Sequence, residues 1–208
     1  MLNNIMTEGE CSKLRSLIHH ANNIVLCCHV SPDGDAIGSV LGMAEVLKCM
    51  GKEPVMVVPD QFPDYLQWLP NTEKIVRYDK RSDYVDMVLK IADLVICLDF
   101  NALSRTDDME AALEACTAPR VLIDHHLNPS IACQVCVSHP NMSSTSELVF
   151  RVAWHLGLFE QLGRHFATAV YCGMMTDTGG FTFNSNSPET FYIISQLLTK
   201  HINKDKIY

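Results

Sequence analysis

Short apolar segments alternate with longer amphipathic ones along most of this chain, and this alternation limits the fold more than any other feature. Segments such as residues 24–29 and 94–98 are apolar throughout, which is typical of strands buried on both faces. Strands that alternate with helices favour a parallel sheet covered on both sides. We expect strands at residues 24–29, 53–58, 74–78, 94–98, 120–123 and 133–137, with the last suited to a sheet edge.

Helices are expected between these strands and after the last one. Ser144 opens a Ser-Thr-Ser-Glu sequence that fits a capping box, and Pro188 lies where a first-turn proline starts a helix. Gly51 fits a C-terminal helix cap. We therefore predict an α/β fold with a mainly parallel sheet of five to six strands and a helical end. The expected helices cover residues 10–21, 35–50, 65–69, 84–91, 107–116, 144–156, 163–176 and 188–200.

Three of the apolar strands end at an ionisable residue, namely His29, Asp99 and Asp124. The carboxyl ends of parallel strands meet at one edge of a sheet, where ligands bind. We therefore expect these three side chains to converge. Asp99 follows an apolar strand and needs a partner, because an unpaired buried charge is costly. Taken alone, however, Asp99 is better explained as a helix cap or a loop acid.

The segment around His29 carries two further acids. His29, Asp33 and Asp35 are spaced i, i+4 and i+6 across a Pro/Gly turn, which can fold the three side chains towards one point. The N-terminus of the helix that follows also favours anions. An Asx turn with Asp35 as the helix cap is the alternative interpretation.

The triplet Asp124-His125-His126 has no obvious structural purpose at a strand end. Neutral imidazole is a common metal ligand, and a second histidine can act as an acid or contact a phosphate. Asp177 lies in a polar, glycine-rich turn after an apolar helix, where it serves as a ligand or forms the turn.

Together these segments supply four aspartates and two or three histidines as ligands, with no cysteine needed. Oxygen-rich ligands with some imidazole suit Mn²⁺ or Mg²⁺ better than a metal that prefers thiolates. Such a set is large enough for two ions that share a carboxylate. Paired ions about 3.5–4 Å apart activate a water and stabilise phosphoryl oxygens. The sequence therefore predicts a metal-dependent phosphoesterase.

This ordered set of motifs resembles the DHH phosphoesterase superfamily over about residues 10–200. The segment HVSPDGDAIGS at residues 29–39 is similar to the oligoribonuclease and pAp-phosphatase branch (nanoRNase type), and TDTGGF at residues 176–181 fits the same branch. The resemblance implies two divalent cations, with Mn²⁺ preferred and Mg²⁺ or Co²⁺ as substitutes. It places one ion on His29, Asp33 and Asp99, and the second on Asp35, Asp99, His125 and Asp177.

The resemblance also implies roles beyond the metal shell. His126 is expected to contact the scissile phosphate and protonate the leaving oxygen, while Asp124 orients its neighbours. Two substrate contacts are weaker candidates. Arg105 can reach a phosphate as a fork donor, although a solvated loop arginine fits equally well. Ser144 at a helix start can contact a phosphate, although capping alone explains it.

Members of this branch usually carry a C-terminal DHHA1 domain. The resemblance therefore implies that residues 1–200 form the DHH catalytic domain and that residues 201–208 begin a linker to a DHHA1 domain absent from this chain. A short natural variant is the alternative. Substrate selection would depend on a cleft between the two domains.

The net charge of −8 and the lack of a Lys/Arg cluster argue against a protein that follows long nucleic acid. No apolar run approaches the ~20 residues of a membrane helix. The nine cysteines are an odd number and scattered, as expected for free thiols in a reducing compartment. We expect a cytoplasmic protein that binds a small phosphorylated nucleotide, with neither long nucleic acid nor a membrane as partner. A homodimer is compatible with the sequence.

The predicted function is manganese-dependent hydrolysis of short oligoribonucleotides, dinucleotides of the pApA type, or pAp. An inorganic pyrophosphatase or exopolyphosphatase of the same superfamily is the enzymatic alternative. A RecJ-like exonuclease fits the size and acidity less well. A non-catalytic nucleotide-binding fragment is the third possibility, but such a domain should have lost ligands that this chain retains.

Overall fold

A parallel sheet lies at the centre of the computed structural model, which describes residues 2–207. Its six strands run in the order β3-β2-β1-β4-β5-β6, and every neighbouring pair is parallel. The α/β prediction and the edge position of the last strand are confirmed. The strands are β1 (Ile24–Cys27), β2 (Val55–Val58), β3 (Val76–Arg77), β4 (Leu94–Leu98), β5 (Arg120–Asp124) and β6 (Val135–Ser138).

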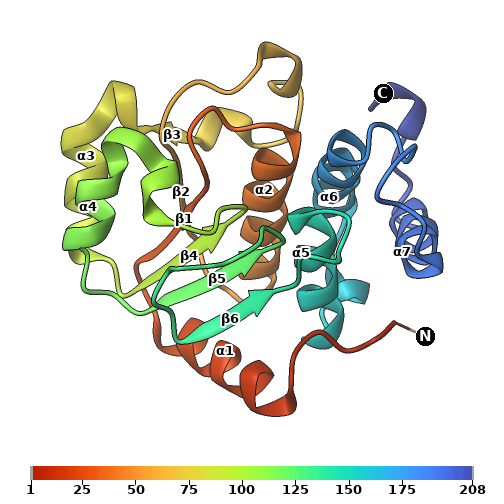
Figure 1. The fold of residues 1–208 in the computed structure, drawn as a ribbon, viewed down its shortest axis with the longest axis horizontal. Coiled ribbons are helices and arrows are strands. Elements are labelled where there is room, and N and C mark those ends of the chain that lie inside the picture. Colours follow the sequence, from red (N-terminus) through yellow and green to blue (C-terminus); the bar gives the residue numbers. More distant parts are fainter. Residues whose placement is uncertain (1, 208) are drawn as a thin grey trace.

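Helices cover both faces of this sheet (Figure 1). Because strand side chains alternate between faces, one set packs with α3 and α4 and the other with the remaining helices. Leu26 and Ile96 lie in the larger core, whereas Cys27 and Cys97 lie in the smaller one. The helices are α1 (Glu8–His20), α2 (Gly34–Cys49), α3 (Tyr78–Ile91), α4 (Glu110–Ala115), α5 (Thr145–His155), α6 (Arg164–Asp177) and α7 (Pro188–Leu198).

Several predicted boundaries are wrong by a few residues. The edge strand β3 has two residues because Tyr78 already begins α3, which kinks at Arg81. The helix expected at residues 107–116 is divided into a 3₁₀ segment, Leu103–Met109, and the short α4, with Asp107 at φ 50° between helical turns. The helical segment expected at residues 65–69 is a 3₁₀ turn at Asp64–Leu66.

The start of α2 also differs from the alternative interpretation in which Asp35 caps the helix. Asp33 is the N-cap, and its Oδ1 accepts the backbone N–H groups of Asp35 and Ala36 at 3.0 Å each. Asp35 therefore lies inside the first turn, where its side chain is buried. At the other end of α2, Met50 is the cap residue and Gly51 follows it at φ 76°.

Close packing of α2 against α6 brings Asp35, at the start of α2, close to Asp177, at the end of α6. A Cβ atom at Gly38 would lie 2.6 Å from the carbonyl oxygen of Ala169, and one at Gly173 would collide with the side chain of Ser146. A Cβ at Gly173 would also stand 3.0 Å from Oδ1 of Asp35. Glycine at these positions lets the helices approach closely enough for their acidic residues to share one site.

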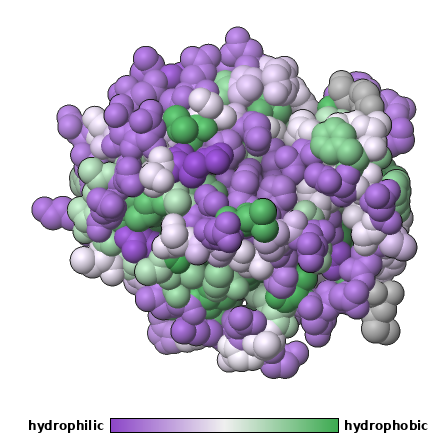
Figure 2. All heavy atoms as spheres, in the orientation of Figure 1, coloured by the Kyte–Doolittle hydropathy of each residue, from purple (hydrophilic) through white to green (hydrophobic). Residues whose placement is uncertain are grey.

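The surface is mixed in character. Figure 2 shows a largely hydrophilic face on which apolar side chains form small, separate patches. Among the helices described, none combines the length and apolar character needed to cross a membrane. Near the end of the chain, Lys204–Lys206 forms a 3₁₀ turn and Ile207 is buried. The division at residue 200 into domain and linker stays a prediction, as does a homodimer.

Candidate active site

The carboxyl ends of β1, β4 and β5 bring the strand-end residues together, as the topology predicts. His29 follows β1, Asp99 follows β4 directly, and Asp124 is the last residue of β5; all three are buried. Nε2 of His29 lies 3.5 Å from Oδ2 of Asp99. Asp99 adopts φ 67°, a left-handed conformation that aspartate tolerates better than most residues.

His29, Asp33 and Asp99 form the first group of metal-type donors. The Nδ1 atom of His29 lies 2.7 Å from the carbonyl oxygen of Val30, which fixes the ring so that Nε2 faces the carboxylates. Burial alone would lower the pKa of His29, but Asp33 and Asp99 raise it to about 10. The group therefore consists of an oriented imidazole between two acids.

Asp35, His125 and Asp177 form the second group. Nε2 of His125 lies 3.9 Å from Asp35 Oδ2, 3.6 Å from Asp177 Oδ2 and 3.7 Å from Asp99 Oδ1. Asp99 therefore faces His125 with one oxygen and His29 with the other. This places its carboxylate between the two donor groups, as expected of a bridging ligand.

The N-terminus of α5 anchors two of these carboxylates. The backbone N–H groups of Thr145 and Ser146 donate to the two oxygens of Asp35 at 2.7 and 2.8 Å. The Thr145 hydroxyl donates to Oδ1 of Asp99 at 2.8 Å. The side chains of Thr145, Asp35 and Asp99 are all buried. Thr145 is not predicted from the sequence, because a Ser-Thr-Ser sequence at a helix start indicates capping and gives no sign of a distant partner.

Ser144 forms the helix cap that we gave as the alternative to a phosphate contact. Its side chain is buried, and its hydroxyl accepts the N–H of Glu147 at 3.0 Å. The capping explanation therefore fits the structure, and the contact of Ser144 with a phosphate stays a prediction. The reciprocal half of the capping box is absent from the described residues, because the Glu147 carboxylate binds the backbone N–H and hydroxyl of Ser143 instead.

The concentration of negative charge at this edge calls for cations. Burial, together with Asp99 and Asp177, raises the pKa of Asp35 well above its usual range. Burial is also the main cause that raises the pKa of Asp177 to about 6, and Asp99 and Asp33 add to it. Unpaired carboxylates this close together are unfavourable, and bound divalent cations would offset their charge.

The spacing and chemistry of the donors fit divalent ions. Within each group the donor atoms all lie within 4.8 Å of one another. Atoms bound to one ion at about 2.1 Å are separated by about 3 to 4 Å, and the measured His–Asp distances are 3.5 to 3.9 Å. Carboxylates with imidazole are suitable ligands for such ions. The residues present can therefore hold divalent metal.

Asp124 and His126 form a hydrogen-bonded pair, and His126 also belongs with Asp99 and His125 to a third group of metal-type donors. Nδ1 of His126 lies 2.7 Å from Oδ1 of Asp124, and this contact is the main cause that raises the pKa of His126. The nearby positive charge of Arg105 acts in the opposite direction. Oδ2 of Asp124 is buried without a hydrogen bond among residues 2–207. The pairing fixes the ring and leaves Nε2 of His126 for another partner.

Arg105 is exposed on the Leu103–Met109 segment, near this pair. Its carbonyl oxygen accepts the N–H of Val30 at 2.7 Å, which ties the segment to the loop that follows β1. The guanidinium is therefore placed at the rim of the site, within electrostatic reach of His126.

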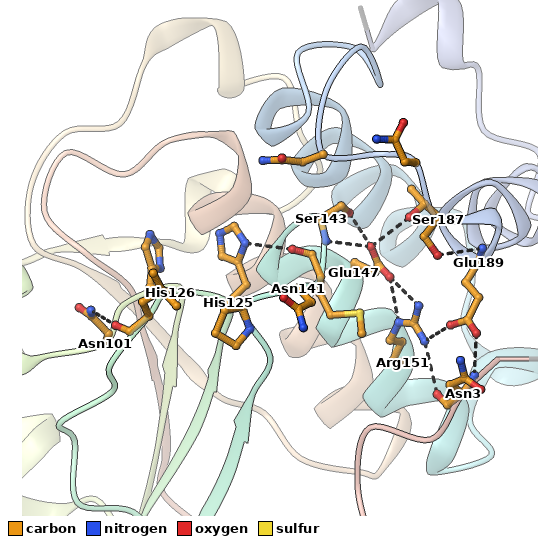
Figure 3. Close-up of a pocket in the computed structure, with 16 residues that line it drawn as sticks. Asn3, Asn101, His125, His126, Asn141, Ser143, Glu147, Arg151, Ser187 and Glu189 are labelled. Atoms are coloured by element: carbon orange, nitrogen blue, oxygen red, sulfur yellow. Dashed lines mark hydrogen bonds and ion pairs between the residues drawn. The ribbon is translucent and has the colours of Figure 1, made fainter.

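A buried ion-pair network lies on the other side of the histidines (Figure 3). The Arg151 guanidinium is 2.7 Å from a carboxylate oxygen of Glu147 in α5 and 2.7 Å from one of Glu189 in α7. Since Glu147 also holds Ser143, the network ties α7 to the start of α5. This network thereby stabilises the start of α5, whose residues Thr145 and Ser146 hydrogen-bond to Asp35 and Asp99.

Comparison with known proteins places this arrangement in a family. The model of the DHH family, N-terminal domain, matches residues 23–174. The bifunctional oligoribonuclease and PAP phosphatase NrnA of Thermus thermophilus is 33% identical over 178 residues, which cover 84% of this chain and 49% of that protein. The cyclic-di-AMP phosphodiesterase GdpP of Bacillus subtilis is 26% identical over 197 residues, 90% of this chain and 29% of that protein.

Solved structures agree with this assignment. The crystal structure of an exopolyphosphatase-related protein from Bacteroides fragilis has a TM-score of 0.97 and 44% identity, and the match covers 100% of this chain and 61% of the other. Exonuclease RecJ bound to manganese has a TM-score of 0.54 at 13% identity, covering 95% of this chain and 49% of the other, which shows a common fold alone. The chain spans about half the length of the NrnA relative. This chain belongs to the DHH family.

Proposed function

We propose that this chain is a metal-dependent phosphoesterase domain that hydrolyses short oligoribonucleotides, dinucleotides of the pApA type, or pAp. The observation that carries the proposal is the position of Asp99, whose two oxygens face two separate donor groups. Relatives named as oligoribonuclease and PAP phosphatase support the substrate class. A phosphate ester of a small nucleotide also suits an acidic chain.

The proposed metal shell has two parts joined by Asp99, with Mn²⁺ as the preferred ion and Mg²⁺ or Co²⁺ as substitutes. When bound, two such ions supply an activated water and stabilise the phosphoryl oxygens. The thiols play no part in this shell. One ion would be held by His29, Asp33 and Asp99, and the other by Asp35, Asp99, His125 and Asp177.

His126 is the proposed acid for the leaving oxygen. Its Nδ1 is occupied by Asp124, so the proton to be transferred sits on Nε2, the only other ring nitrogen. The hydrogen bond to Asp124 raises the pKa of His126 and so favours the protonated imidazole that an acid requires. Asp124 thus acts by orienting His126 and by stabilising its charged form, in the way that a buried carboxylate supports a catalytic histidine.

Arg105 is the proposed contact for a non-bridging phosphate oxygen. Its guanidinium is exposed at the rim of the site and lies near His126. A planar fork donor can bind two phosphate oxygens at once. Its carbonyl contact with Val30 keeps the backbone of Arg105 close to the strand-end loop that carries His29.

The second candidate is a pyrophosphatase or exopolyphosphatase, favoured by the likeness to the exopolyphosphatase-related protein. A substrate panel with Mn²⁺ separates the two. Hydrolysis rates for pApA, pAp, pyrophosphate and polyphosphate are measured side by side. We expect turnover of pApA or pAp, and turnover of pyrophosphate alone refutes the proposal. An inactive but folded chain that binds nucleotide would favour the non-catalytic alternative.

A further inference from the structure

A cavity of about 860 Å³ opens beside His125 and His126 (Figure 3). Its wall continues from the end of β5 through the segment before α5 to the start of α7. The two histidines at one end belong to the active site described above. The remainder of the cavity has no part in the metal shell, so its lining indicates what else the site accommodates.

Side-chain amides are the main polar groups of this lining. The contributing residues are Asn3, Asn101, Asn141, Asn184 and Asn186. Nδ2 of Asn101 donates to the carbonyl of Leu127 at 2.7 Å, which leaves its oxygen free to accept. Within residues 2–207 the side-chain amides of the other four make no hydrogen bond. Each amide offers two donors and an acceptor, so the cavity presents uncharged groups of both kinds.

The charged residues of the lining are already paired. Arg151 binds both Glu147 and Glu189. Among the described residues that line the cavity, these three are the Lys, Arg, Asp or Glu residues. Beyond the two active-site histidines, the lining therefore has no unpaired cation for a second phosphate and has a surplus of one carboxylate. An anionic group in this cavity would lose its hydration without gaining a counter-charge, whereas a neutral polar group would not.

Apolar contact is available next to the scissile-phosphate position. Leu127 follows His126 directly and is 67% exposed at the cavity, and Pro140 and Met142 also line it. A flat ring can pack on such side chains while its edges hydrogen-bond to amides, because every nucleobase has an apolar face and a mixed donor and acceptor edge.

We propose that this cavity binds the nucleoside next to the scissile phosphate, with the base edge on the asparagine amides and the base face on Leu127. The inference rests on the proposed function and specifies what its substrate must contain beyond phosphate. It selects nucleotides over pyrophosphate and polyphosphate, because those molecules would place a second phosphate beyond the histidines, where the polar lining consists of neutral amides and hydroxyls and a surplus carboxylate.

The test compares pApA with two dinucleotides in which one or the other base is replaced by hydrogen. The variants are Asn141→Ala and Asn186→Ala, and Asn23→Ala serves as the matched control, since Asn23 is exposed just before β1 at the opposite edge of the sheet. We expect each cavity variant to raise KM for pApA about three- to tenfold, as loss of one hydrogen bond predicts. At least one abasic substrate should show the higher KM already in wild type and little further change in the variants.

Binding of adenosine, followed by ligand-observed NMR, provides a readout independent of turnover. We expect binding by wild type and by Asn23→Ala, and its loss in the Asn141→Ala/Asn186→Ala double variant. Equal kinetics for pApA and both abasic dinucleotides overturns this inference while the proposed function stands. Cleavage of pyrophosphate without cleavage of pApA overturns both.

Discussion

Replacing Thr145 by valine tests whether the start of α5 positions the shared carboxylate. Valine keeps the shape of the side chain and removes the hydroxyl that donates to Asp99 Oδ1 at 2.8 Å. A hydrogen bond to a charged group contributes about 1.5–3 kcal/mol, and both partners are buried. Since about 1.4 kcal/mol corresponds to a factor of ten, we expect Mn²⁺ affinity to fall by about 10- to 100-fold, the range found for residues that orient metal ligands.

Isothermal titration with Mn²⁺ measures this affinity directly, and hydrolysis of pApA is followed in parallel. Thr145→Ser is the matched control, because it retains the hydroxyl and the backbone N–H that donates to Asp35. We expect the serine variant to stay within about threefold of wild type, since its donor is preserved. Unchanged Mn²⁺ affinity and unchanged kcat/KM in the valine variant would show that the hydrogen bond does not position Asp99.

Three further predictions concern the same site. Asp99→Ala should abolish both Mn²⁺ binding and hydrolysis, and after EDTA treatment Mn²⁺ should restore wild-type activity better than Zn²⁺; better rescue by Zn²⁺ contradicts the ligand argument. His126→Asn should lower kcat by about 100-fold or more with Mn²⁺ affinity within about threefold, and an unchanged kcat excludes His126 as the acid. The pKa of Asp177 is about 6 in the fold against an ordinary 3.8, so its stabilising contribution is complete below about pH 4 and lost as the pH rises through 6. In EDTA, the melting temperature of Asp177→Asn should therefore fall less than that of wild type between pH 4 and pH 7, and parallel curves refute this.

The sheet edge was predictable because its signals are local. An apolar run followed by His29 or Asp99 indicates a buried strand and a polar strand end within a few residues. Parallel pairing then brings the ends together. The boundary errors near Tyr78 and Asp107 are local too. There the helical segment is interrupted by a kink, at Arg81 and at Asp107, and such a kink leaves no periodic signal in the sequence.

The support behind the site was not predictable in the same way. Thr145 meets Asp35 across 110 positions of sequence and Asp99 across 46. Ser144 and Glu147 fit a capping box, yet Glu147 pairs with Ser143 and Arg151. Such contacts depend on how α5 packs against α2 and α7, and a single sequence does not specify that packing.

The close crossing of α2 and α6 implies an unusually low tolerance to substitution at its glycines. Gly38 and Gly173 have no side chain to bind metal, carry a proton or touch substrate, yet a single methyl group at Gly173 would collide with Ser146 and stand 3.0 Å from Asp35. Relief of that collision by moving α6 would carry Asp177 away from Asp35. Gly38 and Gly173 therefore accept as few other residues as the metal-type donors do, although neither takes part in the chemistry.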